Sequence, residues 1–430
     1  KLKIMVEKLI TFSLRNRAVV LLVSACLFVW GVYSVQQNPI DAIPDLSENQ
    51  VIVFTEWMGR SPQVIEAQVT YPLVSNLQGI PKVKNIRGAS MFGMSFVYII
   101  FEDDVDIYWA RTRVLERLNY AQRLLPQNVV PTLGPDGTGV GHVFWYHLNA
   151  DGMDLGEQRA LQDWYVKFAL QTVPGVAEVA SFGGFEKQYQ LVLDPLKMQY
   201  YNVSMMEVMN AVKANNNDVG GRKFEMSDMS YIIRGLGYIK NIKDVEEIAI
   251  KNYNSVPVKV KDIGSIQMGG DLRLGIFDEN GNGEVVGGIV VMRYGENADK
   301  VITAVKEKMK EVEKGLPEGV TFKTSYDRSE LIEKAIESVK GTLIEEMIAV
   351  SIIVLLFLFH WRSALIILIQ LPISVAIGFI LLEAFGISSN IMSLTGIALA
   401  IGVVVDDGIV MVENAYRTIS EKQEEMDNNQ

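Results

Sequence analysis

Three acidic residues lie in or beside one long apolar stretch near the end of the chain. Asp406 and Asp407 interrupt the apolar stretch at 391–412, and Glu413 is the first residue after this stretch. About 20 apolar residues in a helix span the hydrocarbon core of a bilayer. Each ionised carboxylate there costs on the order of 3 kcal/mol, so such residues usually serve function rather than packing. The chemistry that they could perform is the uptake and release of protons or cations.

The spacing of these acids predicts which faces of the helix carry them. Asp406 and Glu413 are seven residues apart, or two helical turns, so they share one face, and Asp407 lies about 100° around the helix. We expect them to face the interior of a helix bundle, where burial favours the neutral carboxyl group and allows it to carry a proton. Two adjacent carboxylates at low dielectric are expected to titrate as a coupled pair. The alternative is a soluble amphipathic helix, but further membrane-length runs precede this one.

Composition excludes several other kinds of chemistry. The net charge of −11 and the lack of a basic, aromatic patch argue against nucleic acid as a partner. The single cysteine, Cys26, allows neither a disulfide within the chain nor a thiolate cluster. The three histidines lack ligand-like spacing, and the sequence contains no phosphate-binding GxxxxGK[ST] motif. We therefore expect no nucleotide-driven motor of the P-loop type and no resident cofactor.

Four apolar runs predict transmembrane helices that flank a large polar region. Lys8, Arg15 and Arg17 precede the first run, and this charge places the N-terminus in the cytoplasm. The predicted segments are a cytoplasmic N-terminus at 1–17, transmembrane helices at 18–35, 338–359, 364–385 and 391–413, and a cytoplasmic tail at 414–430. The external region divides into a first porter subdomain at 36–134, a second at 135–183 and 275–337, and an insert at 184–274.

The external region predicts two copies of one α/β unit. Residues 50–125 follow the order strand, helix, strand, strand, helix, which is typical of a split βαβ, ferredoxin-like subdomain. A second copy begins near residue 142, is interrupted by the insert, and resumes at 284–326. Within the insert, Ser204 and Glu207 form a predicted capping box, and 215–228 read as an exposed hairpin or loop. The fold class is thus an α/β membrane protein with a helix bundle.

Several stretches make the chain resemble the N-terminal half of a resistance-nodulation-division efflux pump. They resemble its heavy-metal branch, and most of all the copper(I)/silver(I) type. They are NPIDAIPDLS at 38–47, YWAR at 108–111, GPD at 134–136, LQDW at 161–164, YDRS at 326–329 and NIMSL at 390–394. The resemblance implies periplasmic porter subdomains with a docking insert. It also implies proton-driven efflux of Cu(I) or Ag(I) from a bacterial inner membrane.

The resemblance also assigns roles and partners. Asp406 and Glu413 match the proton pathway of the family, whereas Asp407 departs from the copper/silver type and resembles the multidrug branch. The implied assembly is a homotrimer with a periplasmic membrane-fusion adaptor and an outer-membrane channel. The family's neighbour-reaching hairpin matches the polar loop, and it implies an oligomer contact at Asn215, Asn216, Asn217, Gly220 and Gly221.

Methionines are the candidate metal ligands, because thioethers are soft donors that select Cu(I). Met392 and Met411 match two positions at which methionines pass metal through the membrane in the resembled family. Val404 and Leu272 stand where further methionines would be expected. For five other methionines the expected role is packing in the core. They are Met91, Met94, Met205, Met206 and Met209.

Two alternative functions remain open from the sequence. The first is a proton/drug antiporter of the multidrug branch, which the Asp406–Asp407 pair suggests. The second is a membrane-anchored sensory or assembly protein whose external subdomains bind a partner, which would have no need of intramembrane acids.

Overall fold

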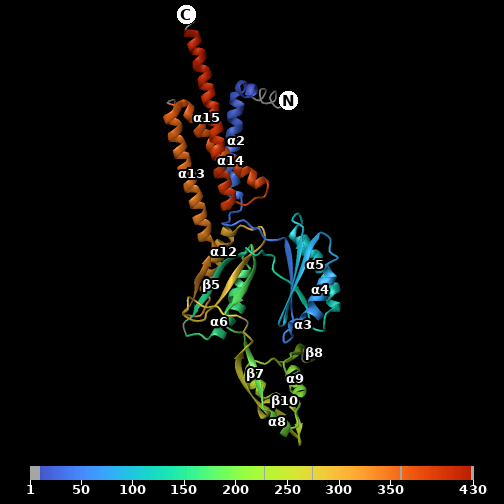
Figure 1. Ribbon diagram of the computed structural model, residues 1–430. Coiled ribbons are helices and arrows are strands. Elements are labelled where there is room, and N and C mark those ends of the chain that lie inside the picture. Colours follow the sequence, from blue (N-terminus) through green and yellow to red (C-terminus); the bar gives the residue numbers. More distant parts are fainter. Residues whose placement is uncertain (1–9, 151, 227, 274, 359–360, 428–430) are drawn as a thin grey trace. The chain divides into compact units, whose positions relative to one another are not determined.

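A computed structural model describes residues 10–150, 152–226, 228–273, 275–358 and 361–427 (Figure 1). Most of the predicted cytoplasmic N-terminus and the end of the predicted tail therefore lie outside the described residues. The chain forms two compact units. Unit 1 comprises Lys1–His147, Lys167–Ala180 and Gly288–Gln430, and unit 2 comprises Leu148–Val166 and Ser181–Gly287.

The first sheet of unit 1 has the strand order β2-β3-β1-β4 and is covered on one face by helices. Strand β1 alternates as predicted, because Val51, Val53 and Thr55 are buried while their neighbours are not. Val53 lies opposite Val97 of β3 in an antiparallel register. The elements are α2 Arg17–Gln37, β1 Gln50–Glu56, α3 Pro62–Ile65, η1 Glu66–Thr70, α4 Tyr71–Leu77, β2 Val83–Met91, β3 Met94–Phe101, α5 Ile107–Ala121, η2 Gln122–Leu124 and β4 Pro131–Leu133.

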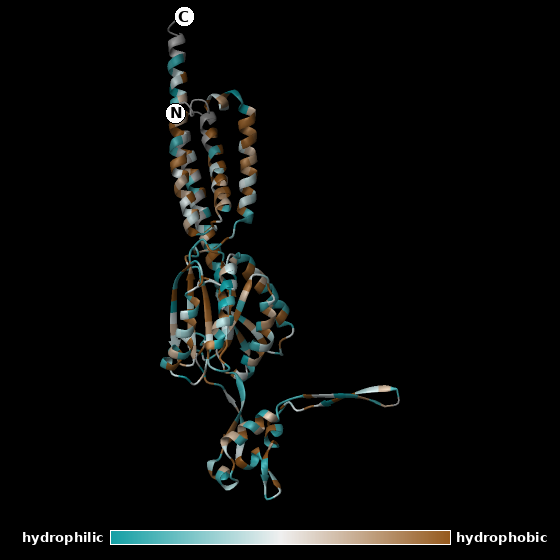
Figure 2. Ribbon diagram, turned by 90° about the vertical axis from the view of Figure 1, so that its right-hand side faces the viewer, coloured by the Kyte–Doolittle hydropathy of each residue, from teal (hydrophilic) through white to brown (hydrophobic). Residues whose placement is uncertain are grey.

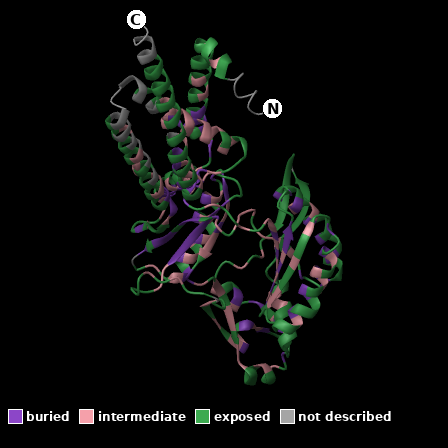
Figure 3. Cartoon of the chain, turned by 45° about the horizontal axis from the view of Figure 1, so that its top comes forward, coloured by how far each residue is buried: buried purple, intermediate pink, exposed green. Residues whose placement is uncertain are grey.

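The second sheet has the order β14-β5-β13-β6, and most of its buried residues lie on β5 and β13 (buried residues are purple in Figure 3). All seven residues of β13 are buried, which explains its continuous apolar sequence. Helix α12 packs against β14 through an apolar stripe that includes Val301, Val305 and Met309. The elements are β5 His142–Ala150, α6 Leu155–Leu161, η3 Gln162–Val166, α7 Lys167–Gln171, β6 Val176–Phe182, β13 Val286–Met292, α12 Ala298–Glu313 and β14 Val320–Asp327.

A π-helical turn interrupts the first long helix of each predicted copy. In η1, the buried hydroxyl of Thr70 is hydrogen-bonded to Ser95 Oγ at 2.7 Å. In η3, the fully buried Gln162 donates through Nε2 to Ser181 Oγ at 3.3 Å. Each π turn thus places a polar side chain toward a serine on a strand, a feature that hydrophobic periodicity does not reveal.

Four apolar helices of unit 1 lie together, and their brown segments stand out in Figure 2. They are α2, α13 Arg328–Leu358, α14 Trp361–Ala384 and α15 Ile391–Asp427. Helix α14 contacts each of the other three. Among the described residues, Arg17–Gln37 and Ile391–Lys422 are long and apolar enough to cross a membrane, and Ile369–Ala384 is a shorter apolar helix.

Two helix ends differ from the sequence prediction. Helix α13 begins at Arg328, directly after β14, rather than at residue 338. Helix α15 does not stop at 413 but continues to Asp427, because no glycine or proline follows Glu413 to end it. Most of the predicted cytoplasmic tail is therefore a helical extension of the last apolar run.

Unit 2 contains three two-stranded antiparallel sheets with short helices. The predicted capping box of α9 is confirmed, because Glu207 N donates to Ser204 Oγ while Glu207 Oε2 accepts from Ser204 N at 2.7 Å. The elements are β7 Lys187–Leu193, α8 Pro195–Tyr200, α9 Met205–Ala214, β8 Val219–Met226, β9 Met229–Gly235, α10 Ile242–Glu246, β10 Ala249–Tyr253, β11 Val256–Lys259, α11 Val260–Ile263 and β12 Gly264–Gly270.

The prediction that five methionines fill the core is wrong for four of them. Met205, Met206 and Met209 are 56%, 62% and 58% exposed, and Met91 is 55% exposed, whereas Met94 is half-buried. The short helix α9 buries Val208 and needs little more to cover its small core. Met91 lies at the end of β2, beside a tight turn.

Helices α2 and α14 approach each other at a glycine. A Cβ on Gly31 would lie 2.4 Å from Ala376 Cβ, whereas a Cβ on Gly378 would meet Ile397 at an ordinary 3.5 Å. We predict that Gly31→Ala lowers the free energy of unfolding by about 1–3 kcal/mol through overpacking. Gly378→Ala, the matched control, should be neutral or gain about 0.5–1 kcal/mol of helix propensity. Thermal unfolding in detergent measures both, and equal responses would contradict close packing at Gly31.

Candidate functional site

The three predicted relay acids are exposed on α15 in this chain. Asp406, Asp407 and Glu413 do not pack between the described helices. The face of α15 that does pack carries Ile401, which is buried against Leu371 of α14. The prediction that the acids face a bundle interior is therefore not met by these helices alone, and the acidic face needs further protein to cover it in a membrane.

A polar side chain that sequence reasoning missed lies against Gly408, the residue that follows the acidic pair. Gln370 of α14 is half-buried, and its Oε1 lies 2.9 Å from the position that a Cβ on Gly408 would occupy. Gly408 follows Asp407 directly, so the glycine makes room for the amide at this level of the helix pair. The sequence did offer a signal for Gln370, namely a carboxamide side chain inside an apolar helix, because an amide both donates and accepts hydrogen bonds.

The two candidate metal ligands lie far apart. Met392 and Met411 are 71% and 66% exposed on α15. Their separation of 19 residues corresponds to about 28 Å along a helix, so they cannot bind one ion together. Met392 lies in the first turn, where Asn390 Oδ1 accepts from the backbone N–H groups of Met392 at 2.9 Å and Ser393 at 3.0 Å. Among the described residues, no group of three or more His, Cys, Asp or Glu side chains could hold a metal ion.

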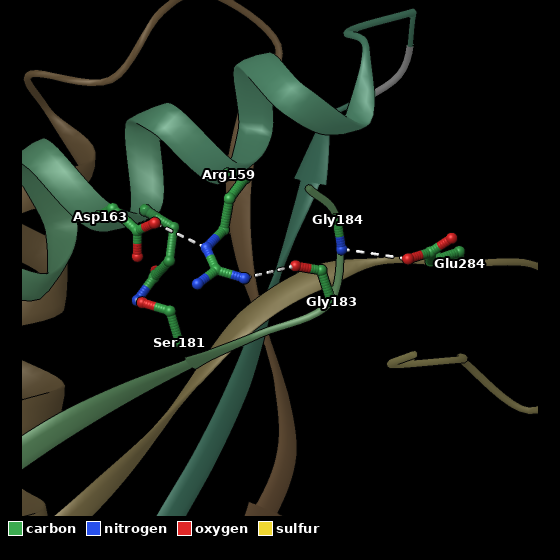
Figure 4. Close-up of polar contacts among 7 residues, drawn as sticks. Arg159, Asp163, Ser181, Gly183, Gly184 and Glu284 are labelled. Atoms are coloured by element: carbon green, nitrogen blue, oxygen red, sulfur yellow. Dashed lines mark hydrogen bonds and ion pairs between the residues drawn. The ribbon is translucent and has the colours of Figure 1, made fainter. Parts of the chain in front are cut away.

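Unit 2 contains a cavity of about 340 Å³ that the sequence did not predict. Its walls include Arg159 at the end of the first helix of the second copy, the Gly183-Gly184 turn after β6, and Leu272 and Arg273 after β12. Figure 4 shows the side chain of Arg159 extending from its helix toward this turn. A ligand in this cavity would meet apolar side chains such as Leu272 together with polar backbone.

Both arginines beside this cavity are paired within its wall. Arg159 Nε lies 2.6 Å from Asp163 Oδ2, and its Nη1 donates to Gly183 O at 3.0 Å. Arg273 forms an ion pair with Glu284, whose carboxylate also accepts from Gly184 N at 3.1 Å. Because both guanidinium groups are neutralised locally, the cavity is not built to bind an anion. Within the part of the chain that the structure describes, no Met, Cys or His lines it, so this lining offers no soft metal ligand.

The predicted oligomer contact is a hairpin formed by β8 and β9, and every described residue of both strands is exposed. It forms the long two-stranded ribbon in Figure 2. Asn215 ends α9 and donates to Ala211 O at 2.8 Å, and Asn216 accepts from Ile239 N at 3.1 Å. The predicted residues Asn215, Asn216 and Asn217 thus precede the hairpin, and Gly220 and Gly221 lie at the start of β8.

The apolar surface of the hairpin lies further along it. Phe224 stacks on Tyr231 with ring centroids 5.1 Å apart, and Ile232 is 73% exposed. Large apolar side chains on both strands of an uncovered ribbon are typical of a protein interface. The sequence prediction named residues at the base of the hairpin and missed the side chains that would contribute binding energy.

Comparison with known proteins shows extended similarity. The model of the AcrB/AcrD/AcrF family matches residues 9–430. The chain is 46% identical over 422 residues to the cation efflux system protein CusA of Escherichia coli K12. It is 37% identical over 429 residues to the cobalt-zinc-cadmium resistance protein CzcA of Cupriavidus metallidurans. A crystal structure of a heavy metal efflux pump superposes with a TM-score of 0.85 at 34% identity.

The chain spans less than half the length of these relatives. The alignments cover 97% and 98% of this chain but 40% of each relative, and the structural match covers 95% of this chain and 41% of the other. The similarity therefore includes the sheets, the insert and the apolar helices described above, and it leaves most of each relative unmatched.

Substitution of Gly183, in the turn that lines the cavity, is expected to destabilise the protein much more than substitution of Gly152. Gly183 has φ +75°, and a Cβ there would lie 2.0 Å from Val285 O, whereas Gly152 has φ +81° with open space around it. Gly183→Ala combines left-handed strain with a backbone collision and should lower the free energy of unfolding by more than about 3 kcal/mol. Gly152→Ala carries the strain alone, about 1–2 kcal/mol. Thermal unfolding compares the two, and similar losses would show that the turn is not crowded.

Proposed function

The chain belongs to the AcrB/AcrD/AcrF family of resistance-nodulation-division transporters, and we propose that it is the N-terminal part of a proton-driven exporter of heavy-metal cations. The preferred cargo is a soft monovalent ion, Cu(I) or Ag(I). The observation that carries the proposal is the acidic set on α15, because carboxylates in an apolar helix are costly and typical of proton pathways. Similarity to proteins named for cation efflux supports the same conclusion.

In this mechanism, α15 carries the proton relay. Asp406 and Asp407 are one residue apart, so the first proton to bind relieves the repulsion between their charges. Gln370 lies against α15 at Gly408, the residue that follows the pair, and its amide can both donate and accept hydrogen bonds. The inward movement of one proton across 100 mV supplies about 2.3 kcal/mol. That energy is available to shift α15 against its neighbours and to change access to the metal path.

The metal would move between separate thioether positions rather than reside at one site in this chain. Met392 and Met411 are proposed as two such positions, since they lie about 28 Å apart along α15. A three-coordinate or four-coordinate metal ion at Met392 or at Met411 needs additional ligands. We propose that these come from protein beyond the 430 residues, because the chain matches only 40% of its relatives' length.

The assembly is proposed to be a homotrimer in a bacterial inner membrane. The four apolar helices would cross the bilayer, and the sheets and insert would lie in the periplasm, as the basic N-terminal flank favours. The exposed hairpin of β8 and β9 would contact a neighbouring subunit. A membrane-fusion adaptor and an outer-membrane channel are the proposed further partners.

A proton/drug antiporter is the second candidate function. The adjacent Asp406 and Asp407 favour it, since the multidrug branch carries paired aspartates. The unit 2 cavity is also lined in part by apolar side chains and lacks soft ligands. Membership of a transporter family does not favour the third possibility, a sensory or assembly protein.

We predict that Asp406→Asn abolishes transport driven by a pH gradient. Asparagine keeps the size of the side chain but cannot take up a proton, so coupling is lost while the fold is retained. Glu383→Gln, in the last turns of α14, removes an acid away from the relay face and should transport like the wild type. The assay measures Ag(I) flux by the full-length transporter in proteoliposomes, with and without a pH gradient.

Equal Ag(I) flux with and without the gradient in the wild-type protein would contradict proton coupling. Gradient-driven movement of a cationic dye in place of Ag(I) would favour the drug antiporter instead.

We predict that a substitution in the hairpin weakens the trimer without unfolding the subunit. Ile232→Asp places a charge on an apolar side chain that is 73% exposed, and it should weaken the trimer because burial of one isoleucine contributes about 1.5–3 kcal/mol. Ser230→Asp adds the same charge at a polar position of β9 and should leave the trimer intact. Sedimentation of the detergent-solubilised protein distinguishes them, and an unaltered trimer in Ile232→Asp would show that the contact lies elsewhere.

A further inference from the structure

Two sequence stretches that the proposed transport chemistry does not use meet where α2 ends and α15 begins. They are 38–47 and 390–394, together with the loop that precedes the second. Asn38 Nδ2 donates to Ser389 Oγ at 2.9 Å and to Ile387 O at 3.1 Å. Ser389 N donates to Pro39 O at 2.9 Å, and Asp41 N donates back to Ser389 O at 3.1 Å. The exit of α2 and the entry to α15 are therefore joined by backbone as well as side-chain bonds.

A third stretch, 326–329, joins this point through a buried arginine. Arg328 lies where β14 passes directly into α13, and its side chain is only 4% exposed. Its Nε lies 2.9 Å from Asp41 Oδ1, and its Nη1 donates to Val140 O. Among the described residues, no hydrogen-bond partner is found for the buried Nε and Nη2 atoms, so the contact with Asp41 is an ion pair rather than a hydrogen bond. Asp41 is thus the main compensation for this buried positive charge.

Asp41 is itself held by the surrounding chain. Its Oδ1 accepts from Ala42 N at 2.6 Å, and the carboxylate lies beside a cavity of about 460 Å³ that Asp45 and Glu296 also line. Burial raises the pKa of Asp41, and this effect outweighs the Arg328 guanidinium, which acts in the opposite direction. Removal of one partner from a buried ion pair leaves an uncompensated charge, which costs far more than an exposed pair contributes.

The end of β14 at this junction is also held by side-chain contacts. Asp327 forms an ion pair with Lys306 of α12, and Asp327 Oδ1 accepts from Ser329 N at 2.9 Å. Burial raises the pKa of Asp327, but the bonds from Lys306 and Ser329 outweigh it and hold the carboxyl group below its usual range. The last residues of β14 and the first turn of α13 are therefore joined to α12 through Lys306, which also donates to Ser329 Oγ at 3.0 Å.

We propose that Asp41 and Arg328 form a coupling joint, the positioning pair that transmits a change in α15 to the β14–α13 junction. The inference rests on the proposed function, because it assigns the coupling step of that transport cycle. A shift of α15 moves Ser389, to which the Asp41 backbone is bonded. Asp41 in turn holds Arg328, which is the first residue of α13 and is preceded directly by the last residue of β14. Neither residue contacts a proton or metal on the relay face.

The first experiment separates coupling from binding in the full-length transporter. Asp41→Asn should lower gradient-driven Ag(I) flux in proteoliposomes about tenfold, which is within the usual range for coupling between sites. Equilibrium Ag(I) binding in detergent should stay within about twofold of the wild-type value. The matched control is Asp45→Asn in the same linker, whose carboxylate accepts from Ser47 N at 3.0 Å rather than binding Arg328. It should leave both measurements unchanged.

A variant guards against simple misfolding. Asp41→Asn with Arg328→Gln removes both charges, so no unpaired charge stays buried, and this variant should fold and bind Ag(I) yet still lose gradient-driven flux. Wild-type flux in Asp41→Asn would overturn the proposal. So would a parallel loss of flux, binding and thermal stability in both variants, because that result would show a structural role only.

A second experiment tests the joint without transport. Asp406→Asn with Asp407→Asn mimics the protonated relay, and hydrogen exchange then reports the amides of 320–329 and 387–391. We expect this pair of substitutions to change exchange at both segments, and to change only 387–391 once Asp41→Asn is added. Propagation to 320–329 without Asp41 would overturn the joint. If the wild type shows no proton-driven flux, the proposed function fails, whereas the exchange experiment still decides the joint.

Discussion

The free energy of removing a carboxylate from water constrains this molecule more than any other single interaction. Asp406 and Asp407 lie on an apolar helix whose packed face is turned toward α14, and the acids are left uncovered by the described helices. In a bilayer, hydrocarbon cannot cover them at acceptable cost. Under the proposed function, protein or water would lie against that face, and the helix would form one wall of a polar path. Gln370 lies against α15 at Gly408, the residue that follows the pair.

The same constraint explains why polar contacts concentrate at the ends of the apolar helices. The exit of α2 and the entry to α15 leave backbone groups that need partners, and they supply these to one another through Asn38, Ser389 and Asp41. Without Asp41, the buried charge of Arg328 would be left uncompensated. Helices that carry few polar groups along their length are thus linked to the sheets through polar residues at their ends.

Much of this fold follows from local patterns in the sequence. The alternation of β1, the capping box of Ser204 and the repeated order of strands and helices were predictable, because each depends on neighbours in the chain. The π turns at η1 and η3, the cavity beside Arg159 and the burial of Arg328 were not. Each of these depends on residues brought together from distant positions. The methionine prediction failed for a similar reason, since composition cannot say which face of a short helix such as α9 is covered.

The two ends of the insert in unit 2 lie side by side. Gly183 is so near the backbone carbonyl of Val285 that a side chain would not fit, and Gly184 N binds Glu284. A segment of about a hundred residues thus leaves and rejoins the second copy at almost one point, which is the geometry that tolerates domain insertion and exchange. Evolution could graft, lengthen or replace this module without disturbing the ancestral sheet. The contacts that this module makes with partners could therefore diversify independently of the apolar helices.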